Sequence, residues 1–267
     1  MVKKRVGRVD SSHPSLFLLI SKRLMILQMK QNTGKNEIGI IFSSKENDKS
    51  EFINHLAQTC GVDTSIYAIH NPNGASLSSV YHQMLTNGNV KEDIVVTVHD
   101  DIEFLKNDWG KELKRLFEEN KEYGIIGVAG SAQFDDMGAW WRYSKIYGQV
   151  LHRHDGKSWL TTFSPLLDHD LEEVAVIDGL FMAFMPSRIK YIYEPTLNGF
   201  DFYDIDFCLN NFVHKSCKIG VTTNIRMAHN SIGELKESWD VNRKIINKKY
   251  KKYYPIDMVK DGKKETR

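Results

Sequence analysis

Asp93–Phe104 reads DIVVTVHDDIEF, and this stretch indicates the fold class. Asp93–Val98 is a continuous run rich in β-branched residues, which predicts a strand buried on both faces, as in the centre of a parallel sheet. The run ends abruptly at the polar sequence His99-Asp100-Asp101. In open α/β sheets, ligands bind beyond the carboxyl ends of the strands, so this triplet marks a candidate site.

Strand and helix patterns alternate on both sides of this stretch. Short apolar runs predict further buried strands at Ile38–Ser44, Ser65–Ile69 and Gly124–Gly130. In the segments between them, apolar residues recur at helical spacing. This alternation predicts a single α/β domain with a mixed, mostly parallel sheet flanked by helices.

Adjacent aspartates at the end of a hydrophobic strand need a compensating charge. Asp100 and Asp101 repel each other unless a cation or hydrogen-bond donors lie between them. Carboxylate oxygens suit Mg²⁺ or Mn²⁺, and magnesium is commonly held by carboxylates together with substrate phosphates. We therefore expect a divalent metal, Mn²⁺ or Mg²⁺, and a diphosphate at this position. The alternative is a solvated acidic turn.

Three stretches of this half resemble a known family. IGIIFSS (38–44), IYAIHNPNGASLSSVYHQML (66–85) and DIVVTVHDDIEF (93–104) resemble the nucleotide-sugar half of family 2 glycosyltransferases, whose GT-A fold is Rossmann-like. They are most similar to the branch grouped with a streptomycin-biosynthesis glycosyltransferase-like domain. The resemblance implies that Asp101 is a metal ligand and that Asp100 lies near the ribose or the metal. It also implies nucleotide contacts from Ser43, Ser44, Asn71 and His82.

Three later stretches extend the resemblance to about residues 38–232. IDGLFMAFMPSRI (177–189) resembles the acceptor-side strand, which implies that Asp178 and Gly179 line the junction between sugar and acceptor. NGFDFYDIDFCL (198–209) resembles the family's catalytic motif. It puts Asp204 at the position of the catalytic aspartate and Asp206 at a nearby substrate-contacting position.

The third stretch, MAHNS (227–231), resembles the family's late histidine motif, which implies that His229 completes the metal site. Trp141 is a further candidate, because residues 135–160 are unusually aromatic and an aromatic ring can stack on a sugar. The glycines of this region favour a mobile acceptor loop. The alternative is a hydrophobic plug over the sheet edge.

The resemblance implies an enzyme, a metal-dependent inverting glycosyltransferase of the hexosyltransferase type. It would transfer a sugar from a nucleotide-sugar, with a UDP-sugar favoured, to a hydroxyl of a glycan or lipid-linked acceptor. The product would be a bacterial surface glycan or a glycosylated metabolite. Asp204 is the expected general base, which takes the proton of the attacking hydroxyl.

Two alternative functions stay open. A nucleotidyltransferase usually has a glycine-rich, lysine-containing phosphate loop after the first strand, and Ser43-Ser44-Lys45-Glu46 does not fit that pattern. The other alternative is a GT-A-like module that binds a sugar nucleotide without turnover. Loss of turnover with retained nucleotide binding on substitution of Asp204 would distinguish an enzyme from such a module.

The charge distribution argues against a nucleic-acid binder. Residues 1–37 carry eight basic and two acidic side chains, residues 242–267 carry ten and three, and the rest carries 18 and 29. Nucleic-acid binders have a basic face on the folded domain, whereas here the body has a net charge of 18 − 29 = −11. The basic ends suit peripheral contact with an anionic membrane surface, and solvated tails are the alternative.

The chain divides into three segments: an N-terminal basic and apolar extension (1–37), the GT-A domain (38–232) and a basic C-terminal helix or tail (233–267). Ser15–Met29 has three interpretations: a signal peptide, an amphipathic helix at a membrane surface, or a region upstream of a true start at Met25 or Met29. No run of 18 uncharged apolar residues exists, which argues against a transmembrane helix. The three cysteines have no paired spacing, which favours a reducing, cytoplasmic setting, at the inner face of the membrane if the basic ends bind there.

Overall fold

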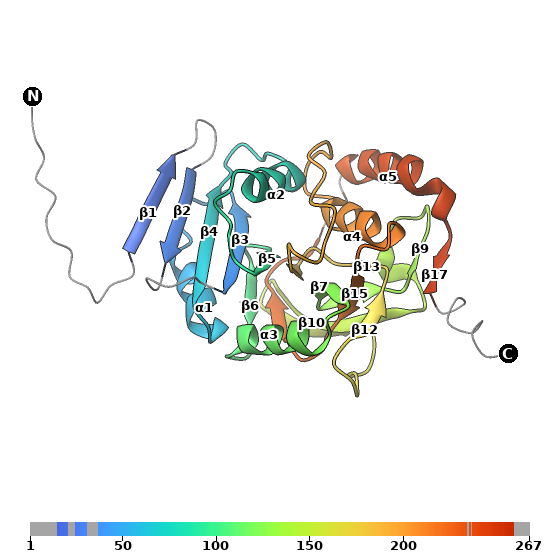
Figure 1. Ribbon diagram of the computed structural model, residues 1–267, viewed down its shortest axis with the longest axis horizontal. Coiled ribbons are helices and arrows are strands. Elements are labelled where there is room, and N and C mark those ends of the chain that lie inside the picture. The colour runs from blue at the N-terminus through green and yellow to red at the C-terminus, as the bar shows by residue number, and fades with distance from the viewer. Residues whose placement is uncertain (1–14, 21–24, 31–36, 234, 236, 259–267) are drawn as a thin grey trace, which may run out of the picture.

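A computed structural model describes residues 15–20, 25–30, 37–233, 235 and 237–258 of the chain. In this part of the chain, nine strands form one mixed sheet (Figure 1). Their order across the sheet is β1 (Ser15–Ile20), β2 (Met25–Lys30), β4 (Thr64–His70), β3 (Ile38–Ser44), β5 (Ile94–Val98), β14 (Phe181–Phe184), β7 (Tyr123–Gly127), β15 (Lys218–Val221) and β12 (Glu172–Val174).

Most strands of this sheet point the same way. β1, β4, β3, β5, β7 and β15 run in one direction, and β2, β14 and β12 run in the other. β3, β5 and β7 are buried almost throughout, as their apolar runs predict. The predicted mixed, mostly parallel α/β fold is therefore confirmed.

A second sheet lies against the carboxyl ends of the central strands. It contains β13 (Val176–Ile177), β8 (Ala129–Ser131), β10 (Ile146–His154), β16 (Met227–His229) and β6 (Ile102–Phe104), and β11 (Lys157–Thr162) pairs with β10. β17 (Ile256–Asp257) and β9 (Gln133–Phe134) form a small two-stranded pair.

Helices cover both faces of the large sheet. They are α1 (Ser50–Cys60), α2 (Leu77–Thr86), α3 (Trp109–Glu119), α4 (Tyr203–Val213) and α5 (Glu237–Tyr250). α1 and α3 lie together on one side, where Trp109 Nε1 donates to Thr59 Oγ1 at 3.1 Å. α2 and α4 lie on the other, where the rings of Tyr81 and Tyr203 are 5.7 Å apart, and α5 lies beyond α4 (Figure 1).

Two segments differ from the sequence-based expectation. Part of the expected N-terminal extension, residues 1–37, forms the hairpin β1–β2, and β2 pairs with β4 in the large sheet. Residues 15–20 and 25–30 are therefore strands, whereas one of the interpretations was a helix. Within residues 135–160, the expected mobile loop is instead largely a β-hairpin, β10–β11. Its sequence hides this, because glycine and histidine interrupt the apolar alternation that marks a strand.

The C-terminal helix α5 packs onto α4 through a buried charge. Asp206, on α4, is 1% exposed, and its carboxylate accepts from Lys249 Nζ at 2.8 Å and from Tyr250 Oη at 2.9 Å. On α5 itself, Asn242, Ile246 and Tyr250 are buried. In the described part of the chain, no helix has the length and apolar character needed to span a membrane.

Replacing Lys249 with Met should destabilise the protein by about 3 kcal/mol or more, because the carboxylate of Asp206 would stay buried without its cation. Chemical denaturation would measure this. Lys248→Met is the matched control, since Lys248 is an exposed neighbour on the same helix, and it should change stability by less than about 0.5 kcal/mol. Equal effects of the two substitutions would show that this ion pair contributes little.

Candidate active site

The candidate site lies where β5 ends. β14 runs antiparallel to β5 with Phe181 opposite Val98, so the residues before β14 lie beside the residues after β5. His99 N donates to Leu180 O at 3.2 Å, which connects the two segments. On the other side, β16 pairs with β6 so that His229 is opposite Ile102. Three segments distant in sequence therefore meet at one place.

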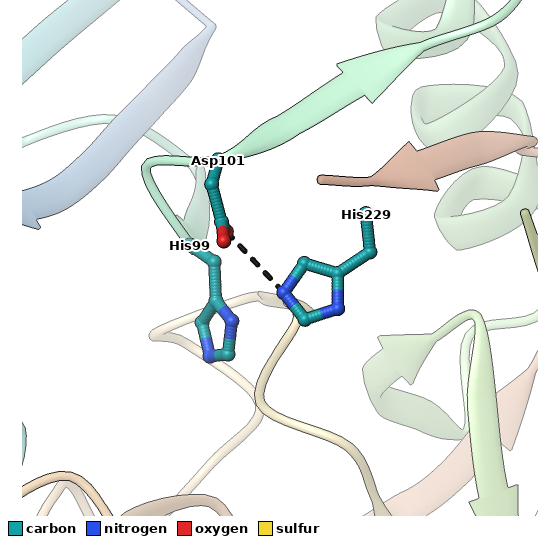
Figure 2. A group of neighbouring side chains, drawn as sticks. All are labelled: His99, Asp101 and His229. Atoms are coloured by element: carbon teal, nitrogen blue, oxygen red, sulfur yellow. Dashed lines mark ion pairs between the residues drawn. The ribbon is translucent and has the colours of Figure 1, made fainter. Parts of the chain in front are cut away.

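His99, Asp101 and His229 form a group that could hold a metal ion. One ligand atom from each lies within 4.8 Å of the others, and all three side chains are half-buried. Figure 2 shows the two imidazoles and the carboxylate converging, with His229 Nε2 at 3.3 Å from Asp101 Oδ1. This brings together the two predicted ligands, Asp101 and His229, and adds His99, which the sequence analysis quoted but did not assign.

The protonation states of these side chains are set by their neighbours. Burial and the nearby His229 lower the pKa of His99, which keeps its imidazole neutral. Burial acts to raise the pKa of Asp101, but the hydrogen bond and charge of His229 outweigh it and hold that pKa well below the usual range. Burial acts to lower the pKa of His229, and Asp101 outweighs it in turn, so the pKa of His229 is raised.

The donor set fits a divalent metal, whose binding would release the proton that Asp101 stabilises on His229. A metal ligand must be a neutral imidazole or an ionised carboxylate, and metal-bound histidines usually donate their second N–H to a neighbouring group. His99 Nε2 lies 3.2 Å from the Tyr203 hydroxyl, which itself donates to Gly179 O at 3.0 Å. The Tyr203 oxygen can thus accept from His99 Nε2–H, which leaves Nδ1 with a free lone pair.

Asp204, the predicted catalytic base, lies at the far end of this hydrogen-bonded chain. Its Oδ2 accepts from Gly179 N at 2.8 Å and its Oδ1 from Ile205 N at 2.8 Å. Burial, and then the charge of Asp178, raises the pKa of Asp204 to about 7. A carboxylate with this pKa is suited to general base catalysis near neutral pH.

Gly179 permits the close approach of α4 to the site. A Cβ at this position would lie 2.1 Å from the Tyr203 hydroxyl and 3.2 Å from Asp204 Oδ2. The neighbouring Asp178 has its Oδ1 occupied by Leu180 N at 2.8 Å. The structure therefore places both predicted junction residues, Asp178 and Gly179, beside Asp204.

Three of the residues expected to contact the nucleotide, Ser43, Ser44 and Asn71, lie at the ends of β3 and β4. Asn71 is buried and donates through Nδ2 to Ser43 Oγ at 3.2 Å and to Ala75 O at 2.8 Å, so it shapes the loop. A hollow of about 60 Å³ opens beside Ser44 and Lys49. A larger hollow of about 560 Å³ is lined in part by α3, and none of the predicted site residues lines it.

Lys49 is a site residue that the sequence analysis missed. Its Nζ lies 3.4 Å from Asp100 Oδ2 and 2.9 Å from Glu46 Oε2, and donates to Asp100 O at 3.3 Å. Lys49 therefore supplies part of the positive charge that the adjacent aspartates need. No sequence pattern marks it, because its approach to Asp100 depends on how the start of α1 packs against the end of β5.

Three other predicted residues make contacts with residues outside this cluster. Asp206 belongs to the α4–α5 contact, because residues two apart on a helix point to nearly opposite sides, and Asp204 faces the site. His82 Nδ1 bonds to Tyr193 O at 2.8 Å. Trp141 packs edge-on against Trp140, with ring centroids 6.0 Å apart.

Residues 40–250 match a family described as a glycosyltransferase-like family, and this match spans most of the chain. The chain belongs to that family. The match reaches the last residue of α5, so this helix is part of the matched unit. No curated protein matches the chain.

Two solved structures show a weak overall likeness to the glycosyltransferase-like chain. A197 from STIV is 12% identical, with a TM-score of 0.43, over 73% of this chain and 86% of that one. The inositol-1-phosphate CTP transferase from T. maritima is 12% identical, with a TM-score of 0.36, over 81% of this chain and 97% of that one.

The raised pKa of Asp204 predicts an unusual pH dependence of stability. The pKa of Asp204 is about 7 in the folded protein and about 3.9 in the unfolded chain. Between these pH values Asp204 is ionised in the unfolded chain but still protonated in the folded protein, so the free energy of unfolding of the wild type falls as pH rises. Asp204→Asn removes this titration. The unfolding free energy of the variant minus that of the wild type should thus increase by about 2–4 kcal/mol from pH 4 to pH 7 and then level off. Urea denaturation across this pH range would measure it, and a flat difference would contradict the raised pKa.

Proposed function

We propose that this protein is a metal-dependent, inverting glycosyltransferase that uses a nucleotide-sugar donor, with a UDP-sugar favoured, and a hydroxyl acceptor. The observation that carries the proposal is the joint placement of two groups in a chain of this family. The His99–Asp101–His229 group and the Asp178–Asp204 pair lie at the same sheet edge, linked through Tyr203 and Gly179. Within the family, we place the chain in the branch grouped with the streptomycin-biosynthesis domain.

The donor set favours Mn²⁺ over Mg²⁺. Mg²⁺ prefers oxygen ligands, whereas two imidazole nitrogens and one carboxylate suit a transition metal. A divalent cation held here would stabilise the negative charge that grows on the departing diphosphate. His99, Asp101 and His229 would hold it, and Lys49 would hold the Asp100 carboxylate in place beside the nucleotide.

Asp204 would act on the acceptor, as the general base of the reaction. As the acceptor hydroxyl attacks the anomeric carbon, its proton passes to the Asp204 carboxylate, and the electron pair of the breaking bond leaves with the nucleoside diphosphate. Each Asp204 oxygen accepts one backbone hydrogen bond and keeps a lone pair for the proton. One direct displacement inverts the anomeric centre and needs no covalent enzyme intermediate.

Donor and metal binding can be tested by thermal stability. We expect one class among UDP-, GDP-, CMP- and dTDP-sugars to raise the melting temperature in the presence of Mn²⁺, since a ligand at about 100 times its Kd stabilises by about 2.7 kcal/mol. His99→Ala and Asp101→Ala should lose the part of this rise in melting temperature that depends on Mn²⁺. His154→Ala is the matched control, because it removes an exposed imidazole outside the group.

Two results would count against the proposal. If no donor shifts the melting temperature of the wild type, the nucleotide-sugar assignment is wrong. If Asp204→Asn retains full transfer activity, Asp204 is not the base. Donor binding without turnover in the wild type would favour a non-catalytic sugar-nucleotide-binding module.

We further propose that the exposed face of α5 contacts an anionic membrane that carries a glycan or lipid-linked acceptor. Val241 and Ile245 are 44% and 40% exposed and lie four residues apart, on the same helix face. Exposed Lys244 and Lys248 lie beside them at the same spacing. A helix with exposed apolar residues flanked by lysines suits a membrane surface.

Binding to vesicles that contain anionic phosphatidylserine would test this contact. Each lysine near such a surface contributes about 1 kcal/mol, so Lys244→Glu/Lys248→Glu should weaken binding more than tenfold. Lys106→Glu/Lys121→Glu is the control, since these lysines are exposed and lie outside α5. Point substitutions are preferable to deletion of residues 242–267, which would remove the buried contacts of α5. Equal vesicle binding by both variants would overturn the proposal.

A further inference from the structure

A row of three rings leads from the candidate metal group to the edge of the second sheet. In the register of this sheet, His229 of β16 is opposite His152 of β10, and His152 is opposite Trp159 of β11. The rings are in contact: centroids are 5.9 Å apart for His229 and His152, and 5.4 Å for His152 and Trp159. The three side chains therefore lie on the same face of the sheet.

Trp159 is exposed and supported from behind. Its ring is stacked on His152, with an interplanar angle of 18°, and the residue is still 39% exposed. The neighbouring Leu160 is 57% exposed, but side chains alternate along a strand, so it points to the opposite face. A large exposed aromatic ring held by a second ring is a rigid apolar surface at the end of the row.

The position of Trp159 suits the acceptor rather than the donor. Two strand spacings, roughly 10 Å, separate it from His229, which belongs to the group expected to hold the donor diphosphate. Trp159 therefore does not belong to the group expected to hold the diphosphate. The charge of Asp178, the predicted junction residue, reaches both His152 and His229.

We propose that Trp159 is a stacking platform for a pyranose ring of the acceptor, and that His152 is a positioning residue that holds the indole in place. The inference rests on the proposed glycosyltransferase function and names the acceptor as a glycan with a hexose near its reactive end. The C–H groups of one pyranose face carry partial positive charge, and the indole face is negative, so the two attract as well as exclude water. This assigns to Trp159 the stacking role that the sequence analysis gave to Trp141.

The test measures sugar binding and donor binding separately. The sugar probes are methyl glucopyranoside, galactopyranoside and mannopyranoside, with binding followed by saturation-transfer NMR in the absence of donor. We expect at least one to bind the wild type, and Trp159→Ala to weaken that binding about tenfold. Trp159→Phe should retain an intermediate affinity, because it keeps an aromatic face.

Leu160→Ala is the matched control, because it removes an exposed apolar side chain of the same strand on the other face. It should leave hexoside binding unchanged, and all three variants should retain the Mn²⁺-dependent thermal shift with the donor. Hexoside binding that is absent from the wild type, or equal in Trp159→Ala and the wild type, would overturn the platform.

The outcomes of the two measurements separate the two proposals. Loss of hexoside binding in Trp159→Ala with donor binding intact supports the platform. Absence of donor binding in the wild type overturns the proposed function, whereas the hexoside measurement still decides the role of Trp159.

Discussion

The candidate site depends on the antiparallel pairing of β14 with β5. Because β14 begins where β5 ends, Asp178 and Gly179 lie beside His99. A parallel strand at this position would place the residues before it at the opposite edge of the sheet. The antiparallel strand inserted among parallel ones therefore brings Asp178 and Gly179 to the segment that carries His99 and Asp101.

The carboxylates of Asp100, Asp101, Asp178 and Asp204 lie at this edge of the sheet, and their negative charges are compensated in two ways. Lys49 balances Asp100, and His229 balances Asp101. Asp178 and Asp204 accept hydrogen bonds from backbone N–H groups instead, and burial together with the charge of Asp178 raises the pKa of Asp204 to about 7. Strongly shifted carboxyl groups at the end of a sheet are a feature of functional sites, because a purely structural carboxylate would gain from full compensation.

The first turn of α4 carries side chains that face two different parts of the molecule. Tyr203 and Asp204 face the site, whereas Asp206 points to α5 and pairs with Lys249. α5 thus packs against the helix that carries the proposed base, and the family match reaches residue 250, the end of α5. The domain limit at residue 232 follows the last recognisable motif and stays a prediction.

The α/β class and most residues of the candidate site could be predicted from the sequence. A short β-branched run such as Ile94–Val98 favours a buried strand, and the polar residues that follow such a strand lie at the edge of the sheet. Asp101, His229, Asp178 and Asp204 were predicted from motifs that resemble those of a known family, and the structure brings them to one edge of the sheet. Tertiary structure decided the rest, because contacts between distant segments leave no local pattern. The approach of Lys49 to Asp100 and the diversion of Asp206 to Lys249 depend on how helices pack. The row from His229 to Trp159 depends on strand register, which follows from pairing across the sheet and not from the sequence of any one strand.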